Sequence, residues 1–125
     1  MIITEKASEF LDKKYTKYLA EASLLRQGFE IVGKKIKVDP VTCDFVIKAD
    51  DEYALVFIIV DHDEEDNDMS AVIKRSTMRA LLKKVFTKYE LEPERKITPV
   101  CMHFTVLEEG KAIIEMFPMR VVTTQ

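Results

Sequence analysis

Three aspartates lie inside or just after apolar segments, where their carboxylates could act together. Asp44 lies within the apolar run Cys43–Ile47, and Asp61 and Asp63 follow the run Ala54–Val60. Asp61 and Asp63 are two residues apart, so their side chains share a face if the strand continues through them. Hard divalent cations such as Mg²⁺ and Mn²⁺ accept carboxylate oxygens as ligands. The spacing therefore predicts a candidate cation site formed by Asp44, Asp61 and Asp63.

The acidic segment also has a second interpretation. Six acidic residues occur between positions 61 and 68: Asp61, Asp63, Glu64, Glu65, Asp66 and Asp68. Runs of like charge are usually solvated. The sequence favours an acidic surface loop without a tightly held ion over the metal site.

A second chemically suggestive group is basic. Arg75, Arg79 and Lys83 recur every fourth residue in a segment with helical periodicity, and Lys84 is adjacent. This spacing places side chains on one helix face, where they can contact phosphates. It predicts a nucleic-acid contact at these four residues. The alternative is the solvent face of an amphipathic helix, and the lack of interleaved aromatic side chains favours that alternative.

The histidines and cysteines form no recognisable motif. His62, His103, Cys43 and Cys101 lack the C-x₂-C and H-x₃-H spacings of zinc sites. There is also no Gly-rich phosphate loop and no context for a nucleophilic triad. We expect two buried free thiols and no cofactor, with Mg²⁺ or Mn²⁺ required only if the chain is a nuclease.

Two helices and several strands must position these residues. Helical periodicity extends from about residue 6 to residue 27 and from Ser76 to Tyr89, and Gly28 is placed to end the first helix. The run Ala54–Val60 is apolar throughout, which is typical of a central strand covered on both faces. Further strands are predicted at residues 29–31, 35–38, 43–47, 100–107 and 112–117.

The element order α-β-β-β-α-β, followed by one more strand, resembles the core of the PD-(D/E)XK nucleases. Three segments are similar to a bacterial branch of endonucleases that resemble archaeal Holliday-junction resolvases. Its motif L-x-x-x-G-[YF]-x-I corresponds to Leu24–Ile31, its G-E-I-D-L-I-A to Val41–Ile47, and its V-F-V-E-V-K to Val56–Asp61. The resemblance extends from about residue 7 to residue 106. It implies a single α/β domain over residues 1–125, with a restriction-endonuclease-like mixed sheet flanked by helices.

In that family an Asp and a Glu on adjacent strands hold Mg²⁺, and a Lys two residues after the Glu helps to orient the attacking water. The resemblance places the Asp at Asp44, the Glu at Ile59 and the Lys at Asp61. It therefore implies that Asp44 and Ile59 lie on neighbouring strands, with their side chains on one side of the sheet. Two further acidic positions of the family correspond to Thr42 and Lys17. Asp44, Ile59 and Asp61 are thus predicted remnants of a catalytic site that no longer supports the reaction.

The resulting expectation is a non-catalytic binding or assembly module, with nucleic acid as a weak, non-specific partner. One alternative is a divergent metal-dependent nuclease that uses Asp44 and Asp61. Another is a protein–protein or homodimerisation module. Fold alone does not choose among them.

Composition sets the remaining limits. The chain has 125 residues, of which 47% are hydrophobic and 33% charged, as expected for one packed domain. The net charge of −3 neither favours nor excludes a nucleic-acid partner. No apolar stretch approaches the roughly 20 residues of a membrane span, and the N-terminus has no secretory-signal pattern. We expect a cytoplasmic protein without membrane contacts.

Overall fold

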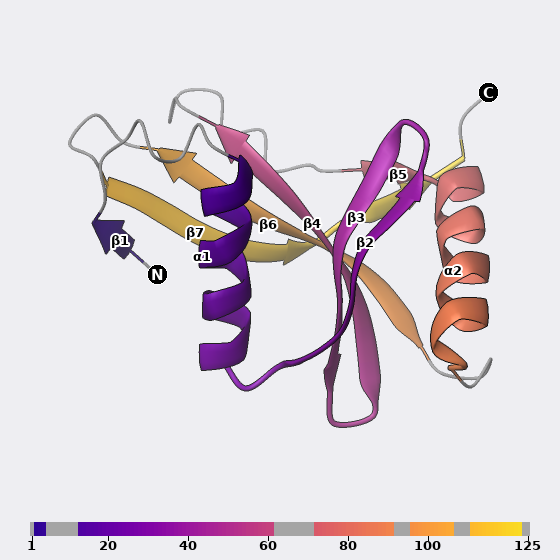
Figure 1. The fold of residues 1–125 in the computed structure, drawn as a ribbon. Coiled ribbons are helices and arrows are strands. Elements are labelled where there is room, and N and C mark those ends of the chain that lie inside the picture. Colours follow the sequence, from indigo (N-terminus) through magenta and orange to yellow (C-terminus); the bar gives the residue numbers. More distant parts are fainter. Residues whose placement is uncertain (1, 5–12, 62–71, 92–95, 107–110, 124–125) are drawn as a thin grey trace.

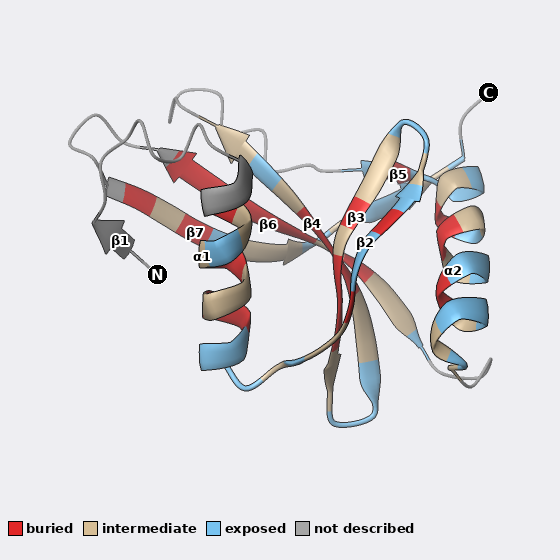
Figure 2. Cartoon of the chain, in the orientation of Figure 1, coloured by how far each residue is buried: buried red, intermediate tan, exposed pale blue. Residues whose placement is uncertain are grey.

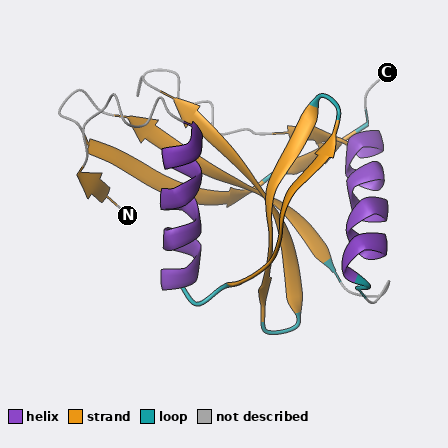
Figure 3. Cartoon of the chain, in the orientation of Figure 1, coloured by secondary structure: helices purple, strands orange, loops and turns teal. Residues whose placement is uncertain are grey.

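The computed structural model describes residues 2–4, 13–61, 72–91, 96–106 and 111–123. It contains two helices and eight strands within these ranges (Figures 1 and 3). In chain order they are β1 (Ile2–Thr4), α1 (Lys13–Arg26), β2 (Glu30–Val38), β3 (Val41–Ala49), β4 (Glu52–Asp61), β5 (Val72–Lys74), α2 (Arg75–Tyr89), β6 (Ile97–Val106), β7 (Lys111–Pro118) and β8 (Arg120–Val122).

Six strands form one mixed sheet in the order β1-β7-β6-β4-β3-β2. Strands β2, β3 and β4 are successive antiparallel neighbours, whereas β4 and β6 are parallel and are separated in the chain by α2. Strand β7 returns antiparallel to β6, and β5 pairs with β8 in a small second sheet. The arrangement confirms the predicted α-β-β-β-α-β order and the mixed α/β sheet flanked by helices.

The two helices pack against opposite faces of the large sheet, and Figure 2 shows the buried positions along the strands between them. Helix α1 contributes Ala20 and Leu24 to one hydrophobic cluster, and α2 contributes Met78, Leu81 and Val85 to the other. Strand β4 supplies residues to both: Val56 belongs to the α1 cluster, and Leu55 and Phe57 belong to the α2 cluster. The middle of β4 is therefore covered on both faces, as predicted.

Helix α1 ends as its sequence indicates. Gly28 has a φ of +93°, a left-handed conformation that glycine adopts without steric cost. The N–H groups of Gly28 and Phe29 donate to the carbonyls of Leu25 and Leu24, both at 3.1 Å. This pair of bonds is a Schellman motif, which satisfies carbonyls that the helix itself leaves unpaired.

Strand β2 differs from the two short strands predicted at residues 29–31 and 35–38. It is one strand with a register shift between Ile31 and Gly33. Tyr89, the last residue of α2, lies so close to Gly33 that a Cβ there would overlap its hydroxyl and ring. The three-residue strands β1, β5 and β8 were not predicted, because so few residues show no periodicity.

Residues 6–12, predicted to be helical, lie outside the described residues. No helix in the described ranges is both long enough and apolar enough to cross a membrane.

Candidate functional site

The Asp44 carboxylate lies on the face of the sheet that α1 covers. Its Oδ1 is 3.5 Å from the Nζ of Lys17 on α1, and its Oδ2 accepts a 2.8 Å hydrogen bond from the backbone N–H of Ile58. Regular pairing between β3 and β4 stops at Phe45 and Val56. The Asp44 carboxylate thus serves as the hydrogen-bond acceptor for a backbone N–H of β4 just beyond the last paired residues. The Asp44 side chain is only 12% exposed, so these protein groups take the place of solvent.

Ile59 lies on the neighbouring strand, as expected, but on the other side of the sheet. Side chains alternate along a strand, and Ile59 follows Leu55 and Phe57 of the α2 cluster. Ile58 and Val60 instead pack against the α1 cluster. The expectation that Asp44 and Ile59 share one face is therefore wrong.

The physical reason for this error is the composition of β4. In a continuous apolar run, a shift of one residue exchanges the two faces without changing the hydrophobic pattern. Ile59 is 37% exposed and does not fill the space beside Asp44. The β4 residues on the Asp44 side are Ile58 and Val60, neither of which carries an oxygen or nitrogen in its side chain.

Asp61 lies on the face opposite Asp44 and contacts a buried histidine. Its Oδ2 is 2.5 Å from His103 Nε2, and His103 Nδ1 is 3.3 Å from the Thr105 hydroxyl. His103 stands between Met102 and Phe104 on β6, and both of these belong to the α1 cluster, so His103 faces away from α1. Its side chain is 5% exposed, whereas that of Asp61 is 41% exposed.

The Asp61–His103 pair is not predicted by the local sequence. The two residues are brought together by the parallel register of β4 and β6, which also pairs Asp61 with Thr105. Nothing in the local sequence specifies that register. Neither the spacing of the residues nor a sequence motif therefore indicates that Asp61 and His103 are in contact.

The three aspartates considered for a divalent cation are not brought together in the described structure. Asp44 and Asp61 lie on opposite faces of the sheet, and Asp63 lies outside the described residues. No group of three His, Cys, Asp or Glu side chains in the described ranges could hold a metal ion. The described neighbours of Asp44 do not favour a divalent cation either, because they include the Lys17 ammonium group and the apolar side chains of the α1 cluster.

Three of the predicted basic residues, Arg75, Arg79 and Lys83, lie along one side of α2, whereas Lys84 is turned by about 100° from Lys83 and contacts β2. Arg75, Arg79, Lys83 and Lys84 are all exposed, while Met78, Leu81 and Val85 on the inner side are buried (Figure 2). The helix contains no acidic residue. The basic face, as we call it, consists of Lys74, Arg75, Arg79, Lys83, Lys84 and Lys88, each of which is exposed.

The charges of this face are less neutralised than those of neighbouring β2. Lys34 pairs with Glu21, and Lys37 pairs with Asp39. Lys84 donates a hydrogen bond to the Lys37 carbonyl, which ties α2 to β2 but leaves the positive charge in place. Among the described residues, no carboxylate forms an ion pair with the basic face.

The two thiols are free and buried, as predicted. Burial raises the pKa of Cys43 to about 12, with the charge of Asp44 adding to the effect. Burial also raises the pKa of Cys101 to about 11, with a smaller contribution from Asp61. Thiolates are the reactive form, so neither cysteine is suited to act as a nucleophile at neutral pH.

Comparisons with known proteins show only a distant likeness. No protein-family model and no curated protein matches the chain. A solved structure of Pyrococcus furiosus SfsA in complex with Ca²⁺ is similar at 13% sequence identity and a TM-score of 0.34. The match covers 87% of this chain and 63% of that one, so the chain spans less than two thirds of the length of SfsA.

Proposed function

We propose that this chain is a non-catalytic module that binds the phosphate backbone of nucleic acid through the basic face of α2. The observation that carries the proposal is the exposure of five basic side chains on a helix without an acidic residue, with the exposed Lys74 directly before it. We also propose kinship with the PD-(D/E)XK nucleases, for which the element order and Asp44 are the support. The free buried thiols favour a reducing compartment such as the cytoplasm.

The non-catalytic part rests on the surroundings of Asp44. A metal-dependent nuclease needs a cation that polarises the phosphate and generates a nucleophilic water. Here the Lys17 ammonium group forms an ion pair with the Asp44 carboxylate. The side chains of Ile58 and Val60, on the same face of β4, carry no atom that could bind a cation. Within the described part of that face, no second carboxylate is present to help Asp44 hold the ion.

The binding part rests on the geometry of α2. Residues four apart in a helix are separated by about 6 Å along its axis, so Arg75, Arg79 and Lys83 extend over about 12 Å. Long, exposed basic side chains spaced in this way can follow successive phosphates. Such contacts release condensed counterions, and they carry no information about base sequence. The expected binding is weak, non-specific and sensitive to salt.

Fluorescence anisotropy with a labelled DNA duplex at low salt tests the proposal. Arg79→Gln combined with Lys83→Gln removes two charges from the exposed side of α2 and should weaken binding at least tenfold. A matched control, Arg26→Gln combined with Lys48→Gln, removes the same charge from α1 and β3 and should bind nearly as wild type. If both double variants lost the same amount of affinity for DNA, binding would depend on the overall charge of the protein and not on the basic face, which would contradict the proposal.

The same samples test the non-catalytic part when they are incubated with Mg²⁺ or Mn²⁺. We expect single-stranded, duplex and branched DNA to remain intact. Cleavage that disappears in Asp44→Ala would overturn this part of the proposal and support the divergent nuclease.

A further inference from the structure

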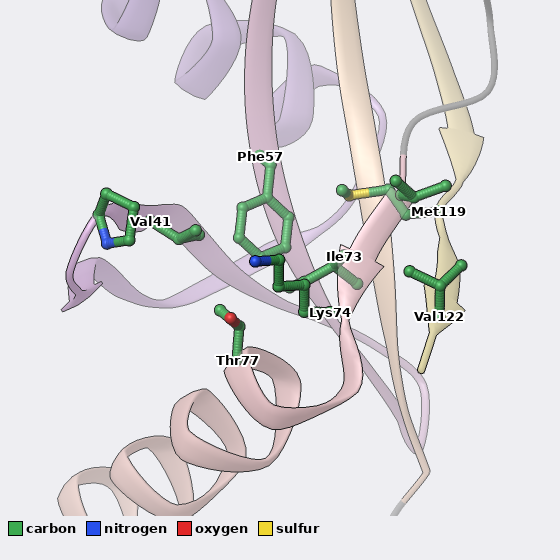
Figure 4. A pocket seen from close by; sticks show the side chains of 9 residues that line it. Val41, Phe57, Ile73, Lys74, Thr77, Met119 and Val122 are labelled. Carbon is green, nitrogen blue, oxygen red and sulfur yellow. The ribbon is translucent and has the colours of Figure 1, made fainter. Parts of the chain in front are cut away.

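A pocket of about 340 Å³ lies where the start of α2 meets the two sheets. It is bordered by the β2–β3 turn, β4, β5 and the C-terminal strand β8 (Figure 4). Its lining consists of Pro40, Val41, Phe57, Val72, Ile73, Lys74, Thr77, Met119 and Val122. Only two of these nine side chains, those of Lys74 and Thr77, carry a hydrogen-bonding group.

The lining suits a ligand with two chemically different ends. Figure 4 shows Lys74 and Thr77 near the first turn of α2, with Met119 and Val122 at the other end of the pocket. Lys74 is exposed, so its ammonium remains in contact with water while its aliphatic stem borders the pocket. Small-molecule sites commonly combine apolar walls with a few polar groups that fix the orientation of the ligand.

We propose that this pocket binds a small amphipathic carboxylate, that is, an aliphatic chain ending in a single negative charge. The aliphatic chain would contact Val41, Phe57 and Met119, and the carboxylate would accept hydrogen bonds from Lys74 and Thr77. Charge complementarity selects an anion, because Lys74 and the adjacent Arg75 are basic and no carboxylate lines the pocket among the residues that the structure describes. This site adjoins the proposed nucleic-acid contact and shares Lys74 with the basic face, whereas Arg79 and Lys83 do not line it.

The volume limits the length of the ligand. A water-sized group takes up about 30 Å³, so the pocket accommodates roughly 11 such groups. This corresponds to a carboxylate with about eight carbons. Octanoate is therefore a suitable probe, and octanamide has the same shape without the charge.

Methyl-detected NMR titration of the full chain tests the proposal. Octanoate should produce saturable shifts at Val41, Ile73, Met119 and Val122. Octanamide should bind about tenfold more weakly, the ratio expected for one charge-assisted hydrogen bond. Lys74→Gln should weaken octanoate binding by a similar factor and leave octanamide binding unchanged, whereas Lys88→Gln, at the far end of α2, should affect neither.

A variant that fills the pocket tests the binding site without changing the charge of Lys74 or of the ligand. Val122→Trp, near the end of the described chain, should abolish the shifts from both probes, and an unchanged NMR spectrum elsewhere would show that the fold is intact. The proposal is overturned if octanoate gives no saturable shift in the wild-type protein. It is equally overturned if octanoate and octanamide bind alike, or if the shifts occur at the methyl groups of Ala80 and Leu82, further along α2, instead of in the pocket.

Discussion

Lys17 on α1 forms an ion pair with Asp44 on β3, at a position where the nuclease resemblance implies two acidic residues beside a cation. The opposite charges of the two side chains attract each other directly. The ion pair also brings α1 and the sheet into polar contact at the edge of the α1 hydrophobic cluster. Asp44 is therefore expected to stabilise the fold, whereas an isolated catalytic carboxylate often destabilises it.

Replacing Asp44 tests that structural role. Asp44→Ala removes the acceptor of the Ile58 N–H and should lower the free energy of unfolding by about 1–3 kcal/mol. Asp44→Asn keeps an acceptor oxygen and should cost less. Urea denaturation at pH 7 measures both. If Asp44→Ala were as stable as wild type, the carboxylate would have no structural role.

The two faces of β4 give a matched pair of substitutions. Ile58→Glu places a carboxylate against the α1 cluster and should destabilise the protein by about 1–3 kcal/mol. Ile59→Glu places the same group at a 37% exposed position and should change the stability by less than about 0.5 kcal/mol. Denaturant midpoints of the two variants provide the comparison. The reverse order of stability would mean that the faces of β4 are assigned the wrong way round.

Much of this fold was predictable from the sequence, and the reasons are local. The apolar periodicity of α2 and the glycine after α1 specify a helix and a helix end by short-range rules, and both predictions are confirmed. The face assignment of Ile59 was not predictable, because every neighbour on β4 is apolar. Asp61 and His103 are 42 positions apart in the chain, and their contact depends on the pairing of β4 with β6. Long-range register has no counterpart in local spacing.

The close approach of Tyr89 to Gly33 predicts a coupled pair. Gly33→Ala should destabilise the protein by about 1–3 kcal/mol, because the new methyl group overlaps the Tyr89 ring and forces it to move. In a Tyr89→Ala background, the same substitution should cost much less. A double-mutant cycle by urea denaturation measures the coupling. Additive effects would show that Tyr89 is not the group that excludes a side chain at Gly33.

The raised pKa values of the thiols predict how stability changes at alkaline pH. Cys43 and Cys101 have pKa values of about 12 and about 11 in the folded protein, above the value of 9.0 for a free thiol. The unfolded chain therefore loses these protons first, and the stability that the buried neutral thiols contribute is complete below pH 9 and falls as pH rises from about 9 to 12. In Cys43→Ala combined with Cys101→Ala, the decline over this range should be shallower. If the loss of stability over this pH range were the same in the double variant, titratable groups other than the two thiols would be its cause.

The same burial predicts low reactivity at neutral pH. A thiol reagent such as DTNB should label the native protein slowly at pH 8 and label two thiols per chain in denaturing urea. Single variants Cys43→Ala and Cys101→Ala identify which thiol reacts first. Rapid labelling of either cysteine in the native protein would contradict its burial.

The most direct test of the proposed function is the slope of log affinity for a DNA duplex against log salt concentration. If the basic face makes about four phosphate contacts, the wild-type slope should be about −3.6, and Arg79→Gln combined with Lys83→Gln should reduce it to about −1.8. The control Arg26→Gln combined with Lys48→Gln should keep the wild-type slope. A wild-type slope near zero, or an identical slope in the α2 double variant, would contradict the assignment of phosphate binding to the basic face.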